Sequence, residues 1–266
     1  MVKKVSVRTL KNIKDNGEKF SMLTAYDYST AKYIDEAGVD VILIGDSLAM
    51  TALGYENTNM VGVEEMTIFT KAVAKGVQRA IVVTDMPFMS YTTDIPSALT
   101  NIGNMVKNGA NAVKLEGCND YILELVRRTV GMGVPVMGHI GFTPQSQNVI
   151  GGHFIQGKTE DAAEELLKQA KLLEQAGAFS VVLEMVPEQV GRYITENISV
   201  PTISCGAGRY CDGFVMVCDD CFGKFGEFTP KFARKYGDMA ELIRTCAKNF
   251  DKDVKTGNYP SENEVY

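Results

Sequence analysis

Residues 39–47 read Val39-Asp40-Val41-Ile42-Leu43-Ile44-Gly45-Asp46-Ser47. The apolar part of this stretch is short and rich in β-branched side chains, which is typical of a strand buried on both faces. It follows Gly38, a residue type that commonly ends a helix, and it stops at a carboxylate. The stretch therefore predicts a helix, a glycine, a buried strand and an acid, in that order.

The same order of features returns at 109–116, which ends in Glu116, and at 177–184, which ends in Glu184. A further apolar strand, 80–84, is followed directly by Asp85. A carboxylate is costly to bury unless it is paired or binds a metal. Four acids at the ends of buried strands therefore indicate one shared site.

The chain of 266 residues alternates predicted strands and helices about eight times, without a linker or a compositional break. This pattern predicts an α/β fold, a (β/α)8 TIM barrel forming a single domain over 1–266, with a polar tail from about residue 252. An open doubly wound sheet is the weaker alternative, and a dinucleotide fold lacks its Gly-x-Gly-x-x-Gly turn. The predicted strands are 20–25, 39–44, 80–84, 112–115, 136–139, 177–184, 201–204 and 214–217.

Three segments outside this alternation carry expectations of their own. Residues 5–19 predict an N-terminal amphipathic helix that closes the bottom of the barrel or covers a neighbouring molecule, and apolar positions left over there favour self-association. Residues 140–158 predict a long Gly-rich loop, and loops of that length are often functional. After the last strand, 239–251 predicts a helix.

Bulk properties exclude several classes of protein. The net charge of −6 and the absence of a basic cluster argue against a nucleic-acid partner. No apolar run approaches the length of a membrane span, so no membrane partner is expected. Six cysteines without framework spacing favour a reducing cytoplasm.

Asp46, Asp85 and Glu116 follow predicted strands two, three and four, which lie side by side in a barrel. Oxygen ligands of this kind suit Mg²⁺, which takes few of its ligands from protein and leaves positions for substrate. The alternative is that these acids pair with Lys or Arg at the rim. Lys114 stands two residues before Glu116, so both side chains point the same way, into the lumen beside the acids or into a structural ion pair.

Glu184 ends strand six, farther round the barrel, and Met185 follows it. This apolar setting favours a general base, although a rim acid that caps the next helix is the alternative. His139 ends strand five and is a candidate site residue, whereas His153 lies in the long loop and gains little support. Ser47 offers a hydroxyl and an amide to a carboxylate.

Cys205, Cys211, Cys218 and Cys221 include one Cys-x-x-Cys pair. A zinc site needs two such pairs at close spacing, and Cys205 and Cys211 are too far apart in sequence. Reduced thiols are therefore the default expectation. Gly206-Ala207-Gly208 is explained equally well by a tight turn and by an anion site.

Several motifs resemble one family, ketopantoate hydroxymethyltransferase, from about Val5 to about Gly257. The motifs are Thr24-Ala25-Tyr26-Asp27-Tyr28, Gly45-Asp46-Ser47, Asp85-Met86-Pro87-Phe88, Lys114-Leu115-Glu116-Gly117, Gly138-His139-Ile140-Gly141-Phe142-Thr143-Pro144-Gln145 and Gly206-Ala207-Gly208. The sequence departs from the family pattern at Ala49, at 59–62, at His153 and at 204–205. These departures affect the rim loops, and no residue can be named as a folate contact.

The resemblance implies a barrel of the phosphoenolpyruvate/pyruvate type with one Mg²⁺ per subunit at Asp46, Asp85 and Glu116. It implies that a hydroxymethyl group passes from 5,10-methylenetetrahydrofolate to 3-methyl-2-oxobutanoate through a Mg²⁺-stabilised enolate, giving 2-dehydropantoate for pantothenate and coenzyme A synthesis. Glu184 is then the base that removes the C3 proton. The resemblance further implies a cytoplasmic homo-oligomer, a decamer.

The substrate-binding residues expected on this basis are Asp46, Ser47, Asp85, Lys114 and His139. The alternative function is a Mg²⁺-dependent C–C or P–C lyase or mutase of the phosphoenolpyruvate/isocitrate lyase type. Enzymes of that type use a cysteine-bearing loop as the acid, and no such motif follows strand four. A catalytically silent assembly protein is a third alternative, and the presence of every proposed ligand argues against it.

Overall fold

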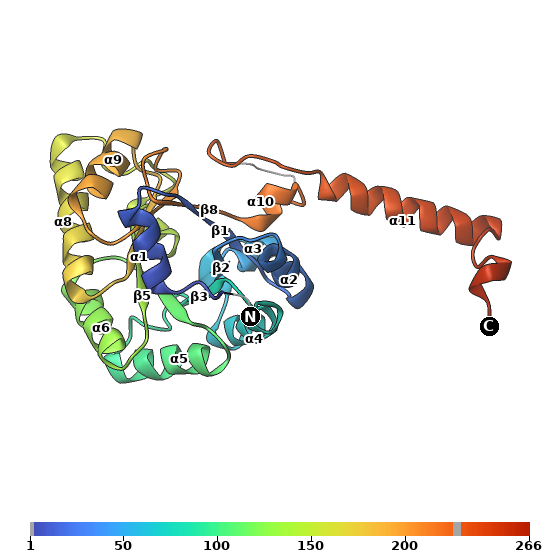
Figure 1. The fold of residues 1–266 in the computed structure, drawn as a ribbon, viewed down its shortest axis with the longest axis horizontal. Helices are drawn as coiled ribbons and strands as arrows, with labels where there is room; N and C mark the ends of the chain where they lie inside the picture. Colours follow the sequence, from blue (N-terminus) through green and yellow to red (C-terminus); the bar gives the residue numbers. More distant parts are fainter. Residues whose placement is uncertain (1–2, 226–229) are drawn as a thin grey trace. The chain divides into compact units, whose positions relative to one another are not determined.

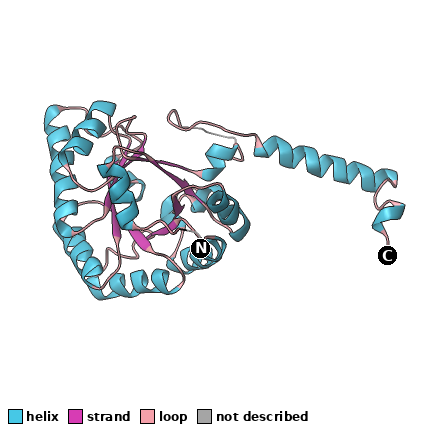
Figure 2. Cartoon of the chain, viewed as in Figure 1, coloured by secondary structure: helices cyan, strands magenta, loops and turns pink. Residues whose placement is uncertain are grey.

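The computed structural model describes residues 3–225 and 230–266 of the chain. Its eight strands form one closed barrel in the order β1 to β8, and every neighbouring pair is parallel. The predicted (β/α)8 barrel is therefore confirmed. Figure 1 shows the outer helices around the strands, and Figure 2 shows the strands enclosed by helices.

The elements agree with the predicted alternation. The strands are β1 Phe20–Thr24, β2 Val41–Ile44, β3 Ile81–Asp85, β4 Ala112–Glu116, β5 Val136–Gly141, β6 Ser180–Glu184, β7 Thr202–Cys205 and β8 Gly213–Met216. The α-helices are α1 Val7–Asp15, α2 Tyr28–Glu36, α3 Leu48–Thr51, α4 Val63–Gly76, α5 Ile95–Lys107, α6 Asp120–Gly131, α7 Gln147–Ile150, α8 Glu160–Ala176, α9 Glu188–Asn197, α10 Cys218–Phe222 and α11 Met239–Thr256. The 3-10 helices are η1 Thr58–Met60, η2 Pro144–Ser146 and η3 Glu262–Glu264.

The barrel interior is filled by side chains that point inward from alternate strand positions. They form one apolar cluster that includes Val83 on β3, Ala112 on β4, Met137 on β5 and Val182 on β6. A side chain two residues later on the same strand points the same way. The strands therefore deliver a polar layer above this apolar cluster, at the carboxyl ends where barrel active sites lie.

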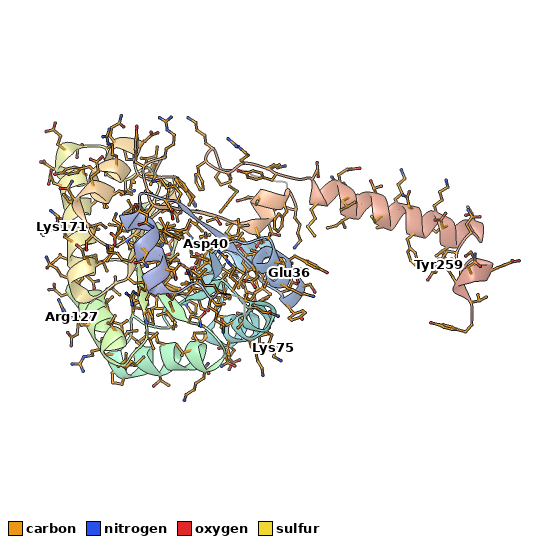
Figure 3. The ribbon with its side chains drawn as sticks, viewed as in Figure 1. Glu36, Asp40, Lys75, Arg127, Lys171 and Tyr259 are labelled. Carbon is orange, nitrogen blue, oxygen red and sulfur yellow. The ribbon has the colours of Figure 1, made fainter. Side chains whose placement is uncertain are left out.

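Four of the outer helices each carry a charged side chain that is exposed. Glu36, Lys75, Arg127 and Lys171 are exposed on four different helices, and Figure 3 shows them projecting from the ribbon. No helix in the described ranges 3–225 and 230–266 is long and apolar enough to cross a membrane.

The N-terminal helix α1 closes the amino end of the barrel. Leu10 is fully buried, and Val5 joins the interior cluster while Val7 and Ile13 pack against it. The apolar positions of this segment are therefore used inside the barrel, and they do not supply the left-over surface from which self-association was expected. The reason is that parallel strands leave an open apolar end that the chain must cover.

Two long connecting segments, 50–60 and 140–158, contain short helices that no pattern in the sequence indicates. The segment 140–158 begins with the end of β5 and includes η2 and α7, and the segment 50–60 contains η1. Runs of three or four residues carry too few periodic apolar positions to be recognised from sequence.

The chain divides into two compact units, Met1–Val217 and Cys218–Tyr266. The first contains the barrel. In the second, α11 continues to Thr256, beyond the predicted end at 251 and past the expected start of the tail, and Gly257 with φ +73° ends it. A single domain over 1–266 remains a prediction.

Candidate active site

The predicted acids and their partners lie at the carboxyl ends of five neighbouring strands. Asp46 follows β2, Asp85 ends β3, Glu116 ends β4, His139 stands on β5 and Glu184 ends β6. The first four are buried, and the side chain of Glu184 is 17% exposed. The closed barrel thus brings residues from five separate segments into one layer.

Lys114 is the buried cation among these acids. Its Nζ lies 3.0 Å from Asp85 Oδ1 and 4.0 Å from Glu116 Oε1, and its side chain is only 7% exposed. Burial acts to lower the pKa of Lys114, but attraction to Asp85 and Glu116 outweighs it and raises the pKa. The residue therefore stays charged at neutral pH and balances one of the carboxylates.

The remaining negative charge is not balanced by Lys114 alone. Burial, followed by repulsion from Asp85 and Glu116, raises the pKa of Asp46 to about 8. Burial likewise raises the pKa of Asp85. For Glu116, burial acts to raise the pKa, but the neighbouring His139 outweighs it and lowers the pKa. The two aspartates therefore resist ionisation, and a bound cation would favour their charged forms.

Two buried carboxylate oxygens also favour a bound cation at these acids. Asp85 Oδ1 and Glu116 Oε1 have charged neighbours but no aligned hydrogen-bond donor among the described residues. Such oxygens are suitable ligands for a hard cation. Among residues 3–225 and 230–266, no group of three His, Cys, Asp or Glu side chains is already arranged to hold a metal ion. Lys114 lies between Asp85 and Glu116, so direct ligation by all three acids stays a prediction.

His139 connects the acids to Glu184. Its Nδ1 lies 3.3 Å from Glu116 Oε1 and 3.2 Å from Lys114 Nζ, and its Nε2 lies 3.3 Å from Glu184 Oε2. Burial and Lys114 act to lower the pKa of His139, but Glu116 and Glu184 outweigh them and raise it to about 9. The imidazole thus lies between the two carboxylates, with one ring nitrogen 3.3 Å from an oxygen of each.

The backbone around Glu184 is held in an unusual conformation. Met185 has φ +49°, which is rare for a residue with a side chain and costs of order 1–3 kcal/mol. Its N–H donates to Cys205 O at 2.9 Å, and its carbonyl accepts from Gln156 N at 2.8 Å. Opposite, Gly141 has φ +93°, and a Cβ there would lie 2.3 Å from Glu184 O. These contacts fix where the Glu184 side chain begins.

Ser47 lies next to the acids, at the start of the short helix α3. Its Oγ is 2.9 Å from Tyr26 Oη, and Thr24 Oγ1 donates to the same Tyr26 oxygen at 2.8 Å. The prediction that Ser47 holds a substrate carboxylate remains a prediction. Tyr26, part of the motif 24–28, is the hydrogen-bond partner of Ser47.

Two residues of this site were missed as functional candidates, Gln145 and Tyr91. Gln145 Nε2 donates to Asp46 Oδ2 at 2.9 Å, and Tyr91 Oη donates to Gln145 Oε1 at 2.9 Å. Gln145 is the last residue of the motif 138–145, and its place in that motif is the only feature of the sequence that points to it. Tyr91 lies in an irregular segment after β3 and had no signal in the sequence.

The remaining candidates lie outside this cluster of contacts. The ring of His153 stacks on Phe142 with centroids 4.9 Å apart. The six cysteines all lie in the described residues and form no disulfide, and Cys211, Cys218 and Cys221 are buried. A cavity of about 430 Å³ lies at the opposite end of β3, lined by Val5, Gln78 and other residues of the amino-terminal face. Neither the contact of the His153 ring nor this cavity involves the clustered acids, whereas Cys205 pairs with Glu184 in the register of β6 and β7.

Comparison with known proteins gives one family. Residues 4–262 match the family model described as ketopantoate hydroxymethyltransferase. A 3-methyl-2-oxobutanoate hydroxymethyltransferase of Clostridium botulinum (strain 657 / Type Ba4) is 50% identical over 262 residues, covering 98% of this chain and 95% of the relative. The enzyme of the same name from Thermosipho melanesiensis is 49% identical over 249 residues, covering 94% of each chain.

Solved structures with the same fold are more distant in sequence. A phosphonopyruvate hydrolase solved with oxalate and Mg²⁺ has a TM-score of 0.63 at 13% identity, covering 98% of this chain and 93% of that one. A 2,3-dimethylmalate lyase of the phosphoenolpyruvate mutase/isocitrate lyase superfamily has a TM-score of 0.61 at 13% identity, covering 100% and 92%. At this identity the likeness establishes the fold.

Proposed function

Because this chain belongs to the ketopantoate hydroxymethyltransferase family, we propose that its clustered strand-end residues are the active site of that reaction. The chain is an enzyme that transfers a hydroxymethyl group to 3-methyl-2-oxobutanoate and forms 2-dehydropantoate, as its relatives are named to do. The observation that carries the assignment to these residues is their convergence: one buried lysine, one buried histidine and four carboxylates meet in one layer.

We propose further that Asp46, Asp85 and Glu116 hold one Mg²⁺ per subunit. The support is the raised pKa of Asp46 and of Asp85, which a cation would offset, and the two buried oxygens without an aligned donor. When bound, Mg²⁺ supplies Lewis-acid polarisation of the substrate's keto oxygen. The acids themselves bind and orient the cation. Lys114 and Ser47 hold the substrate carboxylate.

Glu184 is the proposed base. It accepts the C3 proton of 3-methyl-2-oxobutanoate, and the resulting carbanion forms a C–C bond to the methylene carbon of 5,10-methylenetetrahydrofolate as one of the two C–N bonds of that carbon breaks. Water then supplies the hydroxyl group to the same carbon as the second C–N bond breaks. The C3 proton and the remaining proton of the water go to the two folate nitrogens, and tetrahydrofolate leaves. His139 Nε2 lies 3.3 Å from Glu184 Oε2, so His139 is the proposed positioning residue for this carboxylate. Formation of 2-dehydropantoate from keto acid, methylenetetrahydrofolate and Mg²⁺ tests the whole scheme, and no product under these conditions would contradict it.

The lyase or mutase alternative rests on fold alone. The barrels that resemble this one include a hydrolase and a lyase, but they share only 13% identity with it. The family match covers nearly the whole chain and carries a different reaction. Hydroxymethyl transfer is therefore the function that the chain supports best.

Replacing Asp85 with Asn tests the proposed Mg²⁺ site. The change removes a charge but keeps the shape of the side chain, so Mg²⁺ binding should weaken at least about tenfold, roughly 1.4 kcal/mol. Calorimetric titration of the purified protein with Mg²⁺ measures this directly. Asp94→Asn is a matched control, because Asp94 is an exposed helix cap on α5 away from the acids. An unchanged titration in Asp85→Asn would remove Asp85 from the proposed ligands.

We propose that the enzyme is a cytoplasmic homo-oligomer, a decamer as the resemblance implies. Helix α11 supports self-association, because it has no buried residue and exposes Leu242, Ile243, Phe250 and Val254 at helical spacing. Light scattering at micromolar concentration should give about ten times the chain mass of 29.1 kDa. A single species of about 29 kDa would dispose of this proposal. Six cysteines without a disulfide fit a reducing compartment.

A further inference from the structure

Gln145 is buried beside the acids, and every polar atom of its amide is used. Nε2 donates to Asp46 Oδ2 at 2.9 Å and to Met86 O at 3.0 Å, and Oε1 accepts from Tyr91 Oη at 2.9 Å. Its exposed fraction is 7%. An amide with both N–H groups and its oxygen engaged in a buried site has no freedom to turn.

Tyr91 sets the direction of this amide. The backbone N–H of Glu116 donates to Tyr91 Oη at 3.3 Å, so the hydroxyl proton is directed to Gln145 Oε1. Turning the amide over would place Oε1 against the Asp46 carboxylate and leave the tyrosine proton facing an N–H group. Tyr91 therefore ensures that a donor, and not an acceptor, faces Asp46.

The backbone of Gln145 holds a second acid. Its N–H donates to Glu116 Oε2 at 3.1 Å. Gln145 thus occupies one oxygen of Asp46 through its side chain and one oxygen of Glu116 through its main chain. A substitution of the side chain releases Asp46 only, so the two effects are separable.

We propose that Gln145, oriented by Tyr91, is a positioning residue that keeps Asp46 a one-oxygen ligand and thereby favours Mg²⁺ over Ca²⁺. The inference rests on the proposed Mg²⁺ site. Mg²⁺ requires near-octahedral geometry and few protein oxygens, whereas Ca²⁺ takes more oxygens and accepts a carboxylate through both of its atoms. With Oδ2 occupied by Gln145, Asp46 offers only Oδ1. When the Gln145 side chain is removed, Asp46 can bind the larger Ca²⁺ ion with both oxygens.

Calorimetric titration with Mg²⁺ and, separately, with Ca²⁺ tests this role on the full chain. Gln145→Met keeps the length of the side chain but neither donates nor accepts as the amide does. It should weaken Mg²⁺ binding about tenfold, the lower end for loss of a residue that orients a metal ligand, while Ca²⁺ binding stays equal or tightens. Tyr91→Phe should move the ratio of the two affinities in the same direction by a smaller factor.

The control is Gln147→Met, two residues further on and outside this chain of hydrogen bonds, which should keep both affinities. Equal weakening of Mg²⁺ and Ca²⁺ in Gln145→Met, or an unchanged ratio, would show a merely structural role and overturn the inference. If that variant fails to fold in a thermal melt, Tyr91→Phe decides by the same ratio. A parent protein that binds no Mg²⁺ would overturn the proposed metal site itself, which separates the two failures.

Discussion

Glu184→Gln should lose exchange of the C3 hydrogen of 3-methyl-2-oxobutanoate with deuterated solvent by about 10²–10⁴-fold, the usual contribution of a positioned base. Gln keeps the size of the side chain but cannot accept the proton. Exchange requires only the keto acid and Mg²⁺, so it should occur in the parent enzyme without folate. NMR of the keto acid follows the exchange, and overall turnover should fall by a similar factor.

Binding of the keto acid should change little in this variant, because Glu184 is not a proposed metal ligand. Glu188→Gln is the matched control: Glu188 lies four residues further on and pairs with Arg209 at 2.9 Å, so its change should leave exchange at the parent rate. Exchange at the parent rate in Glu184→Gln would place the base elsewhere. His139, whose Nε2 lies 3.3 Å from Glu184 Oε2, would then be the first residue to test.

Lys114→Met should lower the free energy of unfolding by about 3–5 kcal/mol in the presence of EDTA, because removing one partner of a buried ion pair leaves the others uncompensated. Lys114 is the buried cation 3.0 Å from Asp85 Oδ1. Without it, Asp46, Asp85 and Glu116 face one another with less opposing charge. Urea unfolding followed by circular dichroism measures the difference.

Addition of Mg²⁺ should recover part of this loss, since the cation replaces some of the missing positive charge at the same acids. Lys107→Met, an exposed substitution at the end of α5, should change stability by no more than about 0.5 kcal/mol. Parent stability in Lys114→Met would mean that the acids are protonated in the native protein and that Lys114 contributes no net charge balance.

The strand-end residues were accessible from sequence because a strand has a strict period of two. Val83 and Asp85 share a face, as do Ala112, Lys114 and Glu116. Buried parallel strands read as short apolar runs, and the first charged residue after such a run marks the mouth of the barrel. The fold and the positions of the acids therefore followed from local patterns.

The contacts that loop residues make with the acids could not be predicted from local sequence patterns. Gln145 reaches Asp46 across 99 positions of sequence, and Tyr91 reaches Gln145 across 54. The irregular segments that carry them have no period, so nothing local states where their side chains point. The closure of the bottom by Leu10 was likewise one of two possibilities until the barrel was formed.

Local patterns in the chain were enough to predict the barrel, the strand ends that bear acids and the lysine beside them, because strand period and burial are local properties. The oxygen that each acid leaves available depends on contacts that exist only in the folded protein. Asp46 Oδ2 is taken by Gln145, Asp85 Oδ2 by the Asp46 N–H, and Glu116 Oε2 by the Gln145 N–H. These bonds join segments distant in sequence, and they form only when closure of the barrel brings the segments together.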